Sequence, residues 1–159
     1  MPRLRYWQPS DLPDLQRMSN IATWEITPAD DKAHTTLEQV AANAQQNLMA
    51  MLQSKFGTAI VADEGGQPVG FLLVGLQEND KTGQPHGYMA DIYVEPAFRR
   101  QGLAQAMHAA AEDYLRSIGI GKAANWTHAH NPLGQSSSLR HGFQLWGLML
   151  SKELPSSLS

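Results

Sequence analysis

The chain has 159 residues, enough for one domain with a substantial core. It is 42% hydrophobic and 17% charged, which excludes a disordered protein, and a net charge of −3 gives no electrostatic footprint for nucleic acid. Without cysteines there are no disulfides, thiolate metal sites or cysteine nucleophiles. The sequence has no signal-peptide pattern and no apolar run of the roughly 20 residues that a bilayer-spanning helix needs. We therefore expect a cytoplasmic protein with no membrane or nucleic-acid partner.

The predicted elements begin with a strand and two helices, continue with three strands, and then alternate between helices and strands. Alternation over residues 3–7 predicts a first strand with Leu4 and Tyr6 facing inward, and Ser10 begins a helix that ends near Ile21. The expected elements that follow are a loop over 22–33, a helix from Thr35 or Thr36, strands over 58–62, 68–76 and 88–94, a helix over 103–118, a strand over 122–127, a helix over 133–141 and a strand over 143–152.

This order of elements predicts a single α/β domain over residues 3–152, followed by a C-terminal tail over 153–159. Its central sheet is expected to be mixed and mostly antiparallel, flanked by about four helices. No internal repeat or linker divides the chain.

A turn carrying two arginines and a glycine joins the strand ending at Val94 to the long helix beginning at Leu103. Such a turn is typical of an anion site, because the first N–H groups of a helix lack partners and the helix dipole attracts negative charge. Gly102 lets a ligand approach the backbone, and Arg99 and Arg100 add positive charge. The turn is neither a Walker loop nor a G-x-G-x-x-G loop. A plain helix start with two solvated arginines is the alternative interpretation.

Two blocks of residues resemble signatures of the GNAT superfamily of N-acetyltransferases. The first is Arg99-x-x-Gly102-x-Ala104, and the second runs from Asn131 to Gly-Phe at Phe143. The resemblance implies a sheet splayed between its fourth and fifth strands and transfer of an acetyl group from acetyl-CoA to a primary amine, without a metal. We expect a small-molecule acceptor, with a protein α-amine or lysine, or a non-catalytic acyl-CoA-binding module, as alternatives. The family resemblance also allows a homodimer.

The resemblance further assigns roles to individual residues. The backbone of residues 100–104 would hold the pyrophosphate of CoA, and the edge of strand 92–94 would pair with the pantetheine arm, near Asn131. A backbone N–H at Tyr93 or Val94 would stabilise the oxyanion. Ser138 stands where many relatives have a tyrosine acid, so Ser138 and Tyr93 are the catalytic candidates. The expected cofactor-binding residues are Ile92, Tyr93, Val94, Arg99, Arg100, Gln101, Gly102, Leu103, Ala104, Asn131 and Ser138.

The sequence identifies no general base. Strict alternation puts Tyr88 on one face of the fourth strand and Asp91 on the other, so no carboxylate faces the expected gap unless a bulge intervenes. His128 and His130 would share a strand face, but no third ligand is visible and a metal is not expected. His108 falls on the polar side of the long helix and is expected at the surface. The expected acceptor-pocket residues are Trp24, Glu25, Tyr88 and His128.

Overall fold

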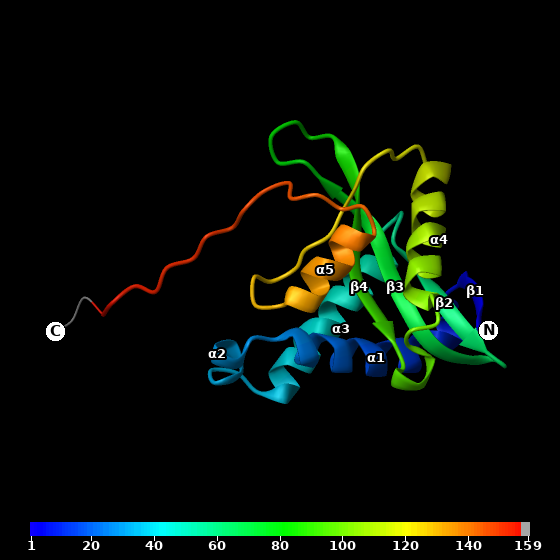
Figure 1. Ribbon diagram of the computed structural model, residues 1–159, viewed down its shortest axis with the longest axis horizontal. Helices are drawn as coiled ribbons and strands as arrows, with labels where there is room; N and C mark the ends of the chain where they lie inside the picture. The colour runs from blue at the N-terminus through cyan, green and yellow to red at the C-terminus, as the bar shows by residue number, and fades with distance from the viewer. Residues whose placement is uncertain (157–159) are drawn as a thin grey trace.

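The computed structural model describes residues 1–156 as one five-stranded sheet with helices on both faces (Figure 1). The strand order is β1-β2-β3-β4-β5; the first four strands are antiparallel, and β5 runs parallel to β4. The predicted α/β fold with a mixed, mostly antiparallel sheet is thereby confirmed. Within these residues the elements are β1 (Arg3–Tyr6), η1 (Pro9–Asp11), α1 (Leu12–Ile26), α2 (Ala29–Lys32), α3 (Leu37–Gln53), β2 (Thr58–Glu64), β3 (Gln67–Glu78), β4 (Pro85–Val94), η2 (Pro96–Phe98), α4 (Leu103–Ser117), β5 (Ala123–Ala124) and α5 (Pro132–Arg140).

Two apolar layers hold the helices on the sheet. Successive side chains of a strand point to opposite faces, so β2 and β3 contribute to both layers and are apolar almost throughout. α4 covers one face, and α1 and α3 cover the other. The buried residues of the α4 layer include Ile60, Leu72, Val74, Met89, Leu103, Met107, Ala111 and Leu115, and those of the other layer include Leu15, Met18, Leu48, Val61, Phe71, Leu73 and Tyr93.

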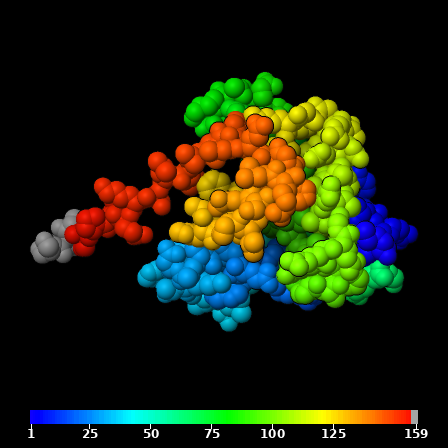
Figure 2. All heavy atoms as spheres, viewed as in Figure 1, coloured from blue at the N-terminus to red at the C-terminus, as the bar shows by residue number. Residues whose placement is uncertain are grey.

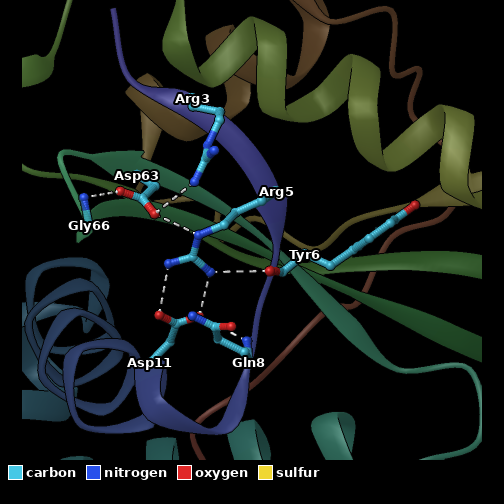
Figure 3. A network of polar contacts seen from close by, with 7 residues as sticks. All are labelled: Arg3, Arg5, Tyr6, Gln8, Asp11, Asp63 and Gly66. Atoms are coloured by element: carbon cyan, nitrogen blue, oxygen red, sulfur yellow. Dashed lines mark hydrogen bonds and ion pairs between the residues drawn. The ribbon is translucent and has the colours of Figure 1, made fainter.

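Arg5 ties the first strand to the β2–β3 hairpin and to the start of α1 (Figure 3). Its Nε donates to Asp63 at 2.6 Å, and its Nη atoms donate to the two carboxylate oxygens of Asp11 at 2.7 and 3.0 Å. These hydrogen bonds hold the pKa values of both carboxyl groups below their usual range. Tyr6 is 55% exposed, so its predicted inward position was wrong. β1 is an edge strand, and the ring of Tyr6 lies 5.9 Å from that of Tyr114 in an edge-to-face arrangement.

The first helical region is longer than the sequence pattern predicts. α1 begins at Leu12, after a 3-10 turn, and continues to Ile26 instead of ending near Ile21. A short helix, α2, then occupies part of the expected loop over 22–33. The fully buried residues of α1 all lie before Asn20, so hydrophobic periodicity carries little signal for its last turn.

The C-terminal part contains less sheet than the sequence predicts. β5 has two residues, because it pairs only with Gly87 and Tyr88 of β4, and beyond that point the two strands separate. The predicted strand over 143–152 was wrong, because this segment extends away from the sheet instead of lying along β5 (Figure 1). The predicted tail over 153–159 lies partly outside the described residues. No helix in residues 1–156 is both long and apolar enough to cross a membrane.

Candidate active site

The turn before α4 presents a run of unpartnered backbone N–H groups. Within the described chain, the N–H groups of residues 100–105 make no hydrogen bond, and that of Ala106 is the next to find an acceptor, the carbonyl of Gly102. Arg100 (φ 63°) and Gly102 (φ 79°) both adopt the left-handed conformation, which costs a non-glycine residue roughly 1–3 kcal/mol. A Cβ on Gly102 would meet no atom within 4 Å, so the space in front of the helix is open. The geometry is that of an anion site.

The two arginines of this turn lie differently. Arg99 donates from Nε to the carbonyl of Val94 at 2.7 Å, and its guanidinium lies 5.4 Å from the centre of the Tyr93 ring. Arg99 therefore fastens the turn to the end of β4. The exposed side chain of Arg100 makes no hydrogen bond or ion pair with any described residue. Of the two cations expected at the mouth of the site, Arg100 is the one free to reach an anion.

A β-bulge in β4 changes which side chains share a face. The pairing with β3 slips by one residue at Ala90, which has no partner of its own. Asp91 consequently stands opposite Leu73 and faces α1 and α3, on the same side as Tyr88. The prediction from strict alternation, which put Tyr88 and Asp91 on opposite faces, was wrong. A one-residue insertion moves every following side chain to the other face.

Asp91 is a half-buried carboxylate without a hydrogen bond or ion pair among the described residues. Burial raises its pKa above the usual range. Burial, together with the charge of Asp91, also raises the pKa of Tyr88. A carboxylate with a raised pKa and no competing cation is a suitable acceptor for a proton near neutral pH. The sequence made Asp91 a candidate base only if a bulge intervened in this strand, and the structure contains that bulge.

Tyr93 is buried and belongs to a chain of polar contacts at the end of β4. Its hydroxyl donates to Glu95 at 3.4 Å, and the second oxygen of Glu95 accepts from Arg17 at 2.6 Å. Burial raises the pKa of the Tyr93 phenol, and the nearby carboxylates Glu95 and Glu25 raise it further. A phenol held in this way is a weak acid. These contacts fix the position of its side chain, and a catalytic role for Tyr93 stays a prediction.

The second motif block forms α5 and its ends. Asn131 is the N-cap, and its Oδ1 accepts the N–H of Gly134 at 3.0 Å, which leaves its Nδ2 free to donate. A Cβ on residue 134 would collide with the Asn131 amide group, so any residue larger than glycine there would have to displace that amide. Ser138 Oγ accepts a hydrogen bond from Asn125 Nδ2 at 2.9 Å. Because Asn125 is the donor, the hydroxyl proton of Ser138 is available for another acceptor.

Two stacked histidines hold α5 against α4. The rings of His108 and His141 lie 4.1 Å apart at an interplanar angle of 23°, with Phe143 edge-on to His108. His108 is 7% exposed, so its predicted surface position was wrong; the end of α5 covers it. Burial, and secondarily the charge of His141, lowers the pKa of His108 to about 4. The contact between the two helices therefore depends on a neutral imidazole.

A cleft of about 340 Å³ lies between the α1–α2 region and the start of α5, which are neighbours in Figure 2. Its walls include the carboxylates of Glu25 and Asp30, together with His130 and Asn131. Among the expected acceptor-pocket residues, Glu25 lines this cleft. The end of α1 and the start of α5 thus face the same cleft.

The other expected acceptor-pocket residues lie outside this cleft. His128 is exposed and its ring lies edge-to-face with that of Trp126, whereas His130 lines the cleft. Trp24 lies beneath the ammonium group of Lys32, which is 4.8 Å from the centre of its ring. Tyr88 stands on β4 beside Asp91. Residues 1–156 contain no cluster of three His, Asp or Glu side chains able to hold a metal ion.

Comparison with known proteins gives a family and a set of similar folds. The Acetyltransferase (GNAT) family matches residues 14–143, most of the chain. No curated protein matches the sequence significantly.

Similar solved structures include acetyltransferases with different acceptors. A GCN5-related N-acetyltransferase from Ralstonia eutropha JMP134 is 22% identical with a TM-score of 0.77, covering 97% of this chain and 99% of the other. The aminoglycoside N-acetyltransferase AAC(6')-Iy, in complex with the bisubstrate analogue CoA-S-monomethyl-acetylneamine, is 19% identical with a TM-score of 0.71, covering 98% and 99%. A ribosomal-protein-alanine N-acetyltransferase from Brucella melitensis biovar Abortus 2308 is 16% identical with a TM-score of 0.67, covering 95% and 99%.

At these identities the structural likeness establishes the fold and leaves the acceptor open. The family match covers both motif blocks, the bulged strand β4 and the whole of α4. The chain therefore belongs to the Acetyltransferase (GNAT) family.

Proposed function

We propose that the protein is an acetyl-CoA-dependent N-acetyltransferase that acetylates a primary amine of a cationic small molecule. The observation that carries this proposal is the uninterrupted run of free N–H groups over residues 100–105, beside the part of β4 that β5 leaves unpaired. A pyrophosphate fits the first feature, and an extended amide-containing chain fits the second. CoA contains both groups in this order.

Acetyl-CoA suits the residues at this position. The backbone N–H groups of residues 100–104 would bind its pyrophosphate, with Arg100 as the free cation. The edge of β4 over residues 92–94 would pair with the pantetheine amides, and the unengaged Nδ2 of Asn131 would donate to the same arm. The open space at Gly102 supports a close approach of the phosphates to the backbone. AAC(6')-Iy, a structural neighbour, carries a CoA-containing analogue.

The cleft between α1 and α5 favours a small cationic acceptor over a protein. Its volume lies at the lower end of the range for small-molecule pockets, roughly 300–1,000 Å³. Glu25 and Asp30 line it, and neither has an ion pair with a described residue. Two unpaired carboxylates attract an ammonium group and would orient a diamine or an amino sugar. A peptide chain would instead need an extended groove.

The residues around the gap divide the chemistry among them. When bound, acetyl-CoA supplies a thioester carbonyl that a neutral amine can attack. An alkylamine with a pKa of ~10 arrives protonated, so a base must remove its proton, and Asp91 is our candidate for this step, directly or through a water. Glu95 donates its N–H to Val69 of β3, so alternation along the strand turns the N–H of Tyr93 toward β3 and that of Val94 toward the open edge. The backbone N–H of Val94 would therefore stabilise the oxyanion. Ser138, oriented by Asn125, would donate a hydrogen bond to the departing sulfur.

Thiol release with a panel of acceptors tests the proposal. The panel holds polyamines, amino sugars, neutral amines, and peptides with a free α-amine or an internal lysine. We expect turnover with cationic small molecules, and Glu25→Gln should raise their KM without changing the KM for acetyl-CoA. Glu64→Gln, an exposed carboxylate of the β2–β3 hairpin, is the matched control. Turnover with peptides alone would refute the proposed acceptor class. Binding of acetyl-CoA without turnover of any compound in the panel would refute the enzymatic function.

A further inference from the structure

Helix α5 carries two residues of the candidate site but has little apolar contact with the rest of the molecule. Asn131 precedes its first residue as the N-cap, and Ser138 lies in its last turn. None of its described residues is buried, and its leucines, Leu133 and Leu139, are 82% and 65% exposed. A surface helix is normally held by an apolar stripe that faces the core. The position of α5 therefore depends on a few specific contacts.

The C-terminal end of α5 is a Schellman cap built around the carbonyl of Ser138. Gly142 adopts the left-handed conformation (φ 86°) that this motif requires just after the cap residue. The N–H of Phe143 donates to the carbonyl of Ser138 at 3.0 Å, and the N–H of Gly142 donates to the carbonyl of Leu139 at 3.1 Å. The N–H of His141 also donates to the carbonyl of Ser138, at 3.1 Å. His141 and Phe143 are thus both tied to the backbone of Ser138.

His108 of α4 contacts both of these residues. Its ring centre lies 4.1 Å from that of His141 and 6.0 Å from that of Phe143. Its neighbours on α4, Met107 and Ala111, are fully buried in the apolar layer between α4 and the sheet, so the position of His108 is fixed. Because burial lowers its pKa to about 4, the ring is neutral near pH 7 and needs no counter-charge. One imidazole on a rigid helix therefore supports the C-terminal end of α5.

The ring of His141 is in turn fixed to its own helix. Its Nδ1 lies 2.7 Å from the carbonyl oxygen of Ser137, and because a carbonyl oxygen accepts, Nδ1 carries the proton and donates. A ring held at both its Cβ and its Nδ1 moves together with the last turn of the helix. An unbroken series of contacts therefore runs from His108 through His141 to the backbone of residues 137 and 138.

Two supports meet at Ser138. Asn125, which directly follows β5, donates from Nδ2 to the hydroxyl oxygen of Ser138 at 2.9 Å and so holds the side chain. The two histidines hold the backbone of the same residue from the α4 side. A hydrogen bond weakens steeply once its distance or angle departs from the favourable range, so the hydroxyl keeps one position only while both supports are present.

We propose that His108 and His141 are positioning residues for acetyl transfer: their stacked rings place α5 so that Ser138 faces the departing sulfur and Asn131 faces the pantetheine arm. The expected effect on the rate rests on the function proposed above, whereas the docking of α5 rests on the contacts alone. Neither histidine touches a substrate in this arrangement. The pair acts on the rate through Ser138 and on acetyl-CoA affinity through Asn131.

A double-substitution cycle between His108 and Ser138 tests the proposal. Ser138→Ala is measured by single-turnover transfer at saturating acetyl-CoA, in the native background and in His108→Ala. In the native chain it should cost less than ~10-fold, as expected for one neutral hydrogen bond. In His108→Ala the hydroxyl is already displaced, so Ser138→Ala should change the rate by less than about twofold. His141→Ala removes a half-buried ring, leaves the core of α4 intact and should give the same result.

His86→Ala is the matched control. His86 is also 7% exposed and also has a buried Nδ1 without a partner among the described residues, but it lies at the start of β4 and contacts Trp146 instead of α5. In this background Ser138→Ala should keep its native cost. His108→Phe retains an aromatic face against His141 and should also preserve that cost. The same cost in native, His108→Ala and His141→Ala backgrounds would overturn the proposal, and so would a native chain in which Ser138→Ala costs nothing.

Hydrogen exchange separates this inference from the proposed function, because it needs no turnover. The amides of α5 should be protected in the native chain, in His86→Ala and in His108→Phe, and should lose protection in His108→Ala and His141→Ala while α4 and β3 stay protected. Unchanged protection of α5 in both of the latter variants would overturn the inference, whatever the activity. A native chain without turnover on any acceptor would overturn the proposed function instead, and exchange would still decide the docking of α5.

Discussion

Gly102→Val and Gly119→Val form a matched pair that isolates ligand binding at the α4 turn from backbone strain. The two glycines flank the same helix, have φ values of 79° and 82°, and would place a Cβ in open space. Valine in this conformation costs roughly 1–3 kcal/mol at either position. Both variants should therefore unfold at similarly reduced temperatures in the absence of ligand. Only position 102 lies in front of the free N–H groups of residues 100–105.

Acetyl-CoA then distinguishes the two variants. At about 100 times its Kd, a ligand that binds only the folded state adds about 2.7 kcal/mol of stability. For a chain of this size, that raises Tm by roughly 5–11 °C. We expect this shift in the native protein and in Gly119→Val, measured by differential scanning calorimetry, and no shift in Gly102→Val. ADP-ribose, which has the pyrophosphate but not the pantetheine arm, should give a much smaller shift.

Two results would refute the reasoning. A normal shift in Gly102→Val would mean that the phosphates do not approach this turn. A loss of the shift in both variants would mean that strain anywhere in α4 disturbs binding, so the turn would have no specific part in it.

Three further predictions concern two groups of the candidate site and the histidine between α4 and α5. Because burial raises the pKa of Asp91, kcat/KM should fall with decreasing pH, with an inflection above the usual aspartate range. Asp91→Asn should remove that inflection and lower kcat by about 10²–10⁴-fold. An unchanged pH–rate profile in this variant would show that Asp91 is not the base. Ser138→Ala should lower single-turnover transfer by less than ~10-fold with unchanged acetyl-CoA affinity, because one neutral hydrogen bond contributes about 1 kcal/mol; a ~10³-fold loss would indicate a proton relay. His108 has a pKa of about 4 in the folded chain and near 6.5 in the unfolded chain. Between these pH values the unfolded state therefore binds more protons than the folded state. The free energy of unfolding should fall as the pH decreases from 6.5 to 4, by up to about 3 kcal/mol. Urea denaturation at several pH values should show this loss, and His108→Phe should abolish it; an equal pH dependence in the variant would contradict the assignment.

Features governed by local chemistry could be predicted from the sequence. The long helix from Leu103 follows from its apolar period, and the turn before it follows from a proline, two arginines and a glycine in order. The hairpin between β2 and β3 likewise follows from two glycines between apolar runs; Gly65 and Gly66 both have positive φ. Each of these signals spans a few residues and needs no knowledge of the rest of the fold.

Features that depend on distant partners could not be predicted. The bulge at Ala90 is visible only in the register between β3 and β4, yet it decides that Asp91 shares a face with Tyr88. The burial of His108 depends on α5, whose docking joins segments about 30 residues apart. Residues 143–152 have a strand-like sequence, but whether such a segment forms a strand depends on its pairing with another strand, which the sequence does not show.

Transfer of labelled acetyl from acetyl-CoA to a cationic amine tests the central claim most directly. Native protein, Gly102→Val and Gly119→Val are each incubated with labelled acetyl-CoA below its Kd and with the best acceptor of the panel, and the amine is isolated. We predict that label reaches the amine with native protein and with Gly119→Val, and that Gly102→Val transfers at least ~10-fold less. Transfer by Gly102→Val at the native rate would contradict the site, and acetyl-CoA that binds without labelling any amine would contradict the function.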